Sequence, residues 1–186
     1  MKTLILETSS EKSILVLADG PKSIAFLPLI GGPELSKKLA LEVSLLLEKY
    51  NFYPEKIAVG QGPGSFTGIR VGAALAQALA FGWRIPLVGI CSLSAFSAPG
   101  HTVLIDARMG GLYALLPGEA PQLIPLSQAA KALQTAPLYA SPHPSQIQKR
   151  ISLPGTWLET SPDPALLAHL AHNSHSPVKL EYLSTP

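Results

Sequence analysis

The chain of 186 residues lacks several features that mark particular protein classes. Its single cysteine, Cys91, excludes an internal disulfide framework and is typical of a reducing compartment. Its longest apolar run, from Ile69 to Phe81, is shorter than the roughly 20 residues of a membrane span. The apolar stretch at the start is interrupted by Glu7, too early for a signal-peptide core. We therefore expect a cytoplasmic protein without a membrane segment.

Charge is also sparse in this sequence. Charged residues make up 14% of the chain and the formal net charge is +2, so non-specific binding to nucleic acid is not expected. Contact with RNA would be local or shared with a partner. The hydrophobic content of 47% predicts a sizeable core in one domain or two small lobes.

A glycine-rich passage from Gly60 to Gly72 contains no lysine, and none occurs between Lys56 and Lys131. A nucleotide P-loop needs a lysine in its glycine loop, so that identity is excluded. The dinucleotide fingerprint also fails, because Thr67 stands where its third glycine is required. What remains is a loop whose glycines can adopt positive φ and whose hydroxyl groups can cap the next helix. An arginine follows in the first turn of that helix. Its residues are Gly62, Gly64, Ser65, Thr67, Gly68 and Arg70.

Two helices carry apolar residues beyond a single stripe. The helix predicted from about Ile69 to Trp83 is apolar nearly all round, and small residues recur on it every four positions. Its sheet would cover one side, and either other helices of this chain or a partner's helices would cover the rest. The helix predicted over Glu34 to Tyr50 has a second strip, Leu41 and Leu45, which lies either under a loop or against a partner.

The order of the predicted elements indicates an α/β fold with a repeat. Strands are expected at 3–7, 13–18, 22–29, 57–59 and 87–90, and helices at 34–50, 69–83 and 93–98. After Pro99 and Gly100 the pattern restarts, with a strand pair at 102–107 and 111–116. Short apolar pieces follow at 123–126 and 137–140, and helical ones at 127–133 and 165–171. We therefore expect two lobes, residues 1–99 and a smaller lobe at 100–186.

Candidate catalytic and metal-binding residues are few. Asp106 and Arg108 follow a strand and are either catalytic or a turn-stabilising pair. His169, His172 and His175 recur every three residues, but neighbouring Asn173 favours a solvated helix end over a metal site. Cys91 has no histidine near it in sequence, which favours a structural thiol.

The passage Gly60 to Gly72, its alanine-rich helix, residues 86–90 and Asp106-Ala-Arg-Met-Gly110 with Tyr113 closely resemble the bacterial TsaB (YeaZ) family over roughly residues 1–115. The resemblance implies the ASKHA fold of actin-like ATPases and sugar kinases, with two related lobes of which the second is shortened here. It also implies a part in forming threonylcarbamoyladenosine in tRNAs that read codons beginning with A. In that family TsaC makes the activated intermediate, TsaD transfers it to tRNA, and TsaB and TsaE assist.

The resemblance further implies a pseudoenzyme that binds and activates TsaD. TsaD-type catalysis uses a metal held partly by a His-x-x-x-His pair on the first long helix, and residues 31–50 hold no histidine. Glu7 stands where the family usually has aspartate, which lengthens the side chain where related enzymes orient metal and phosphate. We expect no catalytic residues, no metal and no cofactor, with ATP or ADP at the joint with TsaD left open. An ASKHA-type ATPase or small-molecule kinase is the alternative.

Partners follow from the same resemblance. Family members pair with themselves or with TsaD through the helices of the first lobe, so we expect a homodimer alone, a heterodimer with TsaD, contact with TsaE, and tRNA only through the complex. The predicted interface residues are Leu41, Leu45, Ile69, Gly72, Ala73, Ala76 and Ala80.

Overall fold

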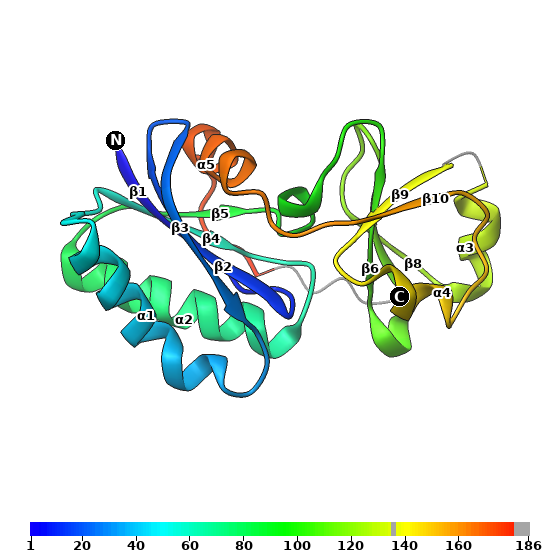
Figure 1. Cartoon of the computed structure of the whole chain (residues 1–186), viewed down its shortest axis with the longest axis horizontal. Coiled ribbons are helices and arrows are strands. Elements are labelled where there is room, and N and C mark those ends of the chain that lie inside the picture. Colours follow the sequence, from blue (N-terminus) through cyan, green and yellow to red (C-terminus); the bar gives the residue numbers. More distant parts are fainter. Residues whose placement is uncertain (135–136, 181–186) are drawn as a thin grey trace.

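The computed structural model describes residues 1–134 and 137–180 and shows two lobes, each built on a five-stranded sheet (Figure 1). The strands of the first lobe are β1 (Lys2–Glu7), β2 (Lys12–Asp19), β3 (Lys22–Ile30), β4 (Lys56–Gly60) and β5 (Leu87–Ile90). In the sheet they lie in the order β3-β2-β1-β4-β5, with β1 antiparallel to β2 and parallel to β4. The predicted meander followed by two further strands is confirmed.

The second lobe repeats this topology with shorter elements. Its strands are β6 (Thr102–Asp106), β7 (Leu112–Leu115), β8 (Gln122–Ile124), β9 (Leu138–Ser141) and β10 (Thr156–Glu159). Their order, β10-β9-β6-β7-β8, is that of the first sheet read from the other edge. Again three strands form an antiparallel meander and two more add in parallel. The restart of the pattern after Gly100 is therefore a structural repeat.

Helices cover both faces of the first sheet. The helices α1 (Leu35–Lys49) and α2 (Phe66–Trp83) share a core with Leu4 and Leu6, whereas Ile5 belongs to a second core on the opposite face, because side chains alternate along a strand. Among the described residues, no helix is long and apolar enough to cross a membrane.

The last helix, α5 (Pro164–Asn173), lies against the first sheet rather than the second (Figure 1). Its buried residues Leu167 and Ala168 pack in one core with Ile5. The Lys56 ammonium donates to the Ala171 carbonyl at 2.6 Å, at the end of the helix where a positive charge is favourable. Residues 100–186 therefore do not form one lobe, since α5 completes the first.

Other differences from the prediction are local. The helix expected at 93–98 is the 3-10 turn η1 (Leu93–Phe96), and the hydroxyl of Ser92, just before it, accepts a hydrogen bond from the Gly62 amide. The remaining elements are η2 (Arg108–Gly110), α3 (Leu126–Ala132) and α4 (Pro144–Gln148). The short α4 and β10 were not predicted, because they lie among prolines and are too brief to show a period.

The approach of α2 to the end of β1 predicts opposite effects for two glycines of the same helix. A methyl group at Gly72 would stand 2.2 Å from the Thr8 hydroxyl oxygen, which donates to the Gly68 carbonyl, whereas one at Gly82 would meet nothing within 4 Å. We expect Gly72→Ala to lower the free energy of unfolding by about 1–3 kcal/mol.

Gly82→Ala is the matched control and should raise the free energy of unfolding by about 0.5–1 kcal/mol, because alanine loses less backbone entropy in a helix. Urea unfolding of both variants measures these changes. Equal effects of the two substitutions would contradict the close contact at Gly72.

Candidate functional site

The glycine loop packs against the turn between β1 and β2. A side chain at Gly64 would meet the Ser9 carbonyl at 2.5 Å, and one at Gly68 would meet the Thr8 carbonyl at 2.1 Å. The Ser65 amide donates to the Ser9 carbonyl at 2.6 Å. The glycines are therefore needed for close approach of two backbones. The space beside this part of the loop is therefore filled by the turn between β1 and β2.

The polar residues of the loop have separate roles. The Ser65 hydroxyl accepts from the Gly68 amide at 3.3 Å and caps α2, as predicted. Thr67 lies in the first turn of the helix, where its exposed side chain lines a cleft instead of capping. The Arg70 guanidinium lies 3.8 Å from the centre of the Phe66 ring, a cation–π contact on the surface of α2.

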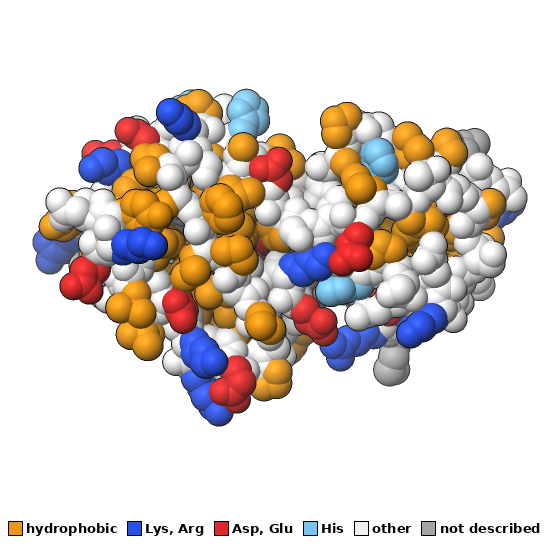
Figure 2. Space-filling model, viewed as in Figure 1, with side chains coloured by type: hydrophobic (Ala, Val, Ile, Leu, Met, Phe, Trp, Pro, Cys, Tyr) orange, Lys and Arg blue, Asp and Glu red, His pale blue; other side chains and the backbone are white. Residues whose placement is uncertain are grey.

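A cleft of about 320 Å³ lies between the two lobes. The first lobe contributes residues 9–11 from the β1–β2 turn and residues 64–67 from the glycine loop. The second lobe contributes residues 105–108, Tyr113, residues 141–143 and Gln146. In Figure 2 the outline of the molecule narrows where the lobes meet. The repeat thus places the first turn of each lobe on opposite sides of one cavity.

Asp106 is held within its own lobe. Its carboxylate accepts a hydrogen bond from the Arg108 amide at 2.7 Å and forms an ion pair with the Arg150 guanidinium. Arg108 has a left-handed backbone, φ 54°, and an exposed side chain on the cleft. Of the two predicted roles, the turn-stabilising one is observed. Arg108 stabilises the turn through its backbone amide, whereas the positive charge beside Asp106 comes from Arg150. Sequence reasoning missed Arg150 because 44 residues separate it from its partner.

Glu7 is fully buried at the end of β1. Its carboxylate accepts from the Ser9 amide at 2.7 Å and packs against Gly60, where an added side chain would clash with it. Burial raises the pKa of Glu7, and hydrogen bonding by Ser9 and Ser92 opposes the rise. Glu7 does not line the cleft. The carboxylate at the position of the family aspartate is therefore an internal group in this chain.

The predicted interface ridge of α2 is not on the surface. Ala76 and Ala80 pack in one core with α1 and the first sheet, and Gly72 lies against Thr8. All members of the ridge are buried; they are Ile69, Gly72, Ala73, Ala76 and Ala80. That part of the prediction is wrong, because the small residues let α2 approach its own lobe closely. Leu41 and Leu45 on α1 are 58% and 49% exposed, so for them the predicted contact stays a prediction.

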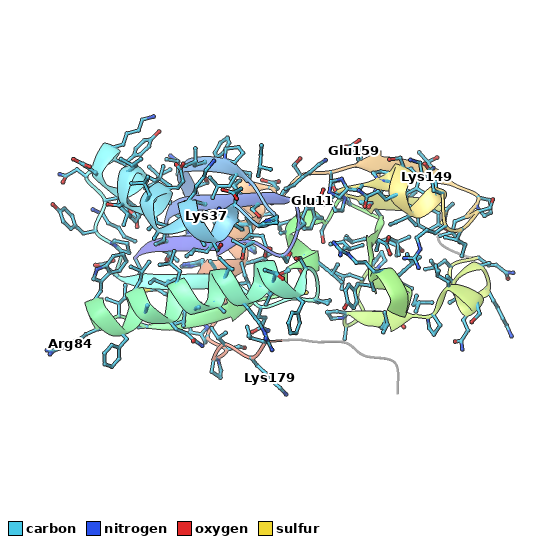
Figure 3. All side chains as sticks on the ribbon, turned by 90° about the horizontal axis from the view of Figure 1, so that it is seen from below. Glu11, Lys37, Arg84, Lys149, Glu159 and Lys179 are labelled. Carbon is cyan, nitrogen blue, oxygen red and sulfur yellow. The ribbon has the colours of Figure 1, made fainter. Side chains whose placement is uncertain are left out.

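The opposite side of α2 presents other apolar groups to solvent. Phe66 is 54% exposed, Phe81 is 89% exposed, and Ala74 and Ala78 between them are also exposed. These positions share one face, since they recur at helical spacing. We define this face together with Leu41 and Leu45 as the outer helical face. Figure 3 shows α1 and α2 side by side. The sequence did not reveal the face, because α2 is apolar nearly all round.

The predicted histidine group lies at the end of α5. His169, His172 and His175 are exposed, and the ring of His169 lies 3.0 Å from the Asn173 amide nitrogen. Within residues 1–134 and 137–180, no group of three potential metal-ligating side chains is close enough to hold an ion. Cys91 is half-buried and packs against a hydrophobic core, in agreement with a structural thiol.

The family model described as TsaD, tRNA N6-adenosine threonylcarbamoyltransferase, matches residues 24–131, which is more than half of the chain. The chain belongs to this family. The tRNA threonylcarbamoyladenosine biosynthesis protein TsaB of Haemophilus influenzae is 45% identical to it over 67 residues, which are 32% of this chain and 28% of the relative. TsaB of Bacillus subtilis is 39% identical over 80 residues, 38% of this chain and 35% of the relative. The match thus spans about a third of these relatives' length.

Solved structures extend the likeness over nearly the whole fold. YeaZ from Pseudomonas aeruginosa superposes with a TM-score of 0.71 at 24% identity, covering 91% of this chain and 90% of its own. A second structure, described as an uncharacterized protein similar to the peptidase YeaZ from that organism, has a TM-score of 0.72 at 23% identity and covers 97% and 99%. The predicted resemblance to TsaB (YeaZ) proteins and the predicted two-lobed α/β fold are both confirmed.

The burial of Glu7 predicts a specific pH dependence of stability. The pKa of Glu7 in the folded state lies above the ordinary value of 4.5, so the folded chain binds the proton more tightly than the unfolded chain does. The stability from Glu7 is therefore present below about pH 4.5 and lost as the pH rises through the folded-state pKa. Glutamine does not titrate, so Glu7→Gln should be more stable than the parent chain near pH 7 and similar to it near pH 4.

Urea unfolding of both proteins between these two pH values measures the difference. Glu48→Gln, on an exposed position of α1, is the control and should leave the pH profile unchanged. A Glu7→Gln protein that is less stable than the parent near pH 7 would show that the buried carboxylate is ionised and paired.

Proposed function

We propose that this chain is the TsaB subunit in the formation of threonylcarbamoyladenosine in tRNA, where it binds and activates TsaD without catalysing the transfer. Family membership and the printed names of the TsaB relatives support the pathway. The outer helical face is the observation that carries the subunit role. It exposes large apolar side chains from two helices, whereas Glu7 is buried and Asp106 is paired with Arg150.

The outer helical face has the composition of a protein contact. Leu45 on α1 and Phe81 on α2 are large apolar side chains that are 49% and 89% exposed. On α2, half-buried Val71, Leu75 and Leu79 pack onto the core of the first lobe. Large apolar side chains exposed together on two neighbouring helices are characteristic of interaction sites. The helices α1 and α2 lie on the same side of the first sheet, so a partner's helices could pack against both (Figure 1).

The polar groups of the cleft support a subunit rather than a transferase, an ATPase or a kinase. Asp106, an acid on the cleft, pairs with Arg150 and accepts a hydrogen bond from the turn that follows it. Glu7 is buried away from the cavity. General acid or base chemistry requires a group within reach of the substrate proton, and neither carboxylate is free for it. The first long helix, α1, carries no histidine pair for a metal.

Assembly with other components is part of the same proposal. The chain forms a homodimer alone and a heterodimer with TsaD, both through the outer helical face, and TsaE joins this complex. With a net charge of only +2, the chain meets tRNA through the complex rather than by itself. Any ATP or ADP binds at the joint with TsaD.

A charge on the outer helical face is expected to weaken the complex with TsaD. Leu45→Glu should raise the dissociation constant about tenfold or more, because the carboxylate would be desolvated at the contact. The free energy of unfolding should change by less than about 0.5 kcal/mol, since Leu45 is 49% exposed. Isothermal titration with TsaD and urea unfolding measure the two quantities.

Ile24→Glu is the matched control, because Ile24 is also 49% exposed but lies on β3. It should leave the affinity for TsaD unchanged. Equal weakening by both substitutions, or by neither, would contradict a contact through the outer helical face.

A further inference from the structure

The turn between β1 and β2 reaches the second lobe with two charged side chains. The Lys12 ammonium donates to the Glu159 carboxylate at 2.7 Å and to the Thr160 carbonyl at 3.0 Å. The Glu11 carboxylate lies 3.6 Å from Nε2 of His143. Figure 2 shows acidic, basic and histidine side chains gathered at this junction, and Figure 3 shows Glu11 and Glu159 there on the facing parts of the two lobes. Both contacts join one turn of the first lobe to the second lobe.

The backbone crosses between the lobes at two places that lie side by side. Residues 97–101 lead from η1 into β6, and residues 160–163 lead from β10 back to α5. The Asp163 amide donates to the Ala95 carbonyl at 3.0 Å, which joins the second crossing to η1, where the first begins. Phe96, Val103 and Ala140 share a hydrophobic core near these crossings. Hinge motion between two lobes is absorbed at short connecting segments of this kind.

The two contacts differ in how completely they are formed. The hydrogen bond from Lys12, and then its positive charge, lower the pKa of Glu159, so the charged form of Glu159 is the paired form. Nε2 of His143 is buried without a hydrogen-bond partner, and 3.6 Å is too long for a hydrogen bond to Glu11. A small further closure of the cleft would bring those two groups into range.

We propose that these contacts form a two-part clasp that sets the opening of the cleft. Lys12 and Glu159 hold the lobes at the observed angle, and Glu11 and His143 engage when the cleft closes further. The side chains of Lys12 and Glu159 are 26% and 65% exposed, so the first contact shifts the equilibrium between open and closed cleft without locking it. The clasp acts on the cleft and is independent of the outer helical face.

Single-molecule energy transfer between the lobes tests the clasp in the full-length chain. Dyes on cysteines placed at exposed Lys22 and Lys131, with Cys91 replaced by serine, report the separation of the lobes at concentrations too low for self-association. Lys12→Met should raise the open population about two- to fivefold, and Glu159→Gln should do the same. The double variant should show no further change, because both substitutions break one contact.

The second part of the clasp has its own readout. Glu11→Gln should remove the most closed population and leave the contact between Lys12 and Glu159 intact. Loss of the most closed population from the distribution of lobe separations supports the clasp. An unchanged closed population in Glu11→Gln overturns the role of Glu11 and His143.

Lys37→Met is the matched control. It breaks the ion pair of Lys37 with Glu34, 2.9 Å long and confined to α1, and should leave the distribution of lobe separations unchanged. Glu159 is exposed, so Glu159→Gln keeps the test decisive if Lys12→Met fails to fold. The clasp would be overturned if Glu159→Gln and the parent chain gave the same distribution of lobe separations. It would also be overturned if Lys37→Met raised the open population as much as Lys12→Met does.

Discussion

The close approach of α2 to the end of β1 is the contact on which the rest of the structure depends. Gly68 and Gly72 bring the helix against Thr8, and the Ser65 amide donates to the Ser9 carbonyl. Such an approach leaves no room for side chains at the glycines. It turns the small residues of α2 inward, leaves Phe66 and Phe81 facing solvent, and makes the glycine loop a packing element.

The structural repeat explains why the molecule has a cleft between two lobes of the same topology. Each lobe places the turn after its first strand on the cleft between the lobes. The acid that ends each first strand makes internal contacts in this chain: Glu7 is buried, and Asp106 is paired with Arg150. What remains at the junction is a set of charged contacts between the lobes, of which that between Lys12 and Glu159 is complete.

The sequence predicted the first lobe well because its elements are long and their periods are clear. The strands of the meander, α1 and α2 were all placed within a few residues. It could not show which side of α2 is buried, since a helix that is apolar nearly all round has no stripe to mark the core. The return of α5 to the first sheet and the pairing of Asp106 with Arg150 join residues far apart in the chain, and no local pattern records such contacts.

The central claim is that this chain supports the transfer of the threonylcarbamoyl group but does not perform it. The most direct measurement is nucleoside mass spectrometry of tRNA incubated with TsaC, TsaE, threonine, bicarbonate and ATP, with the chain and TsaD added together or singly. The scaffold role predicts threonylcarbamoyladenosine well above the level with TsaD alone when both are present, and none with the chain alone at any concentration. Modified tRNA formed by the chain without TsaD would contradict it.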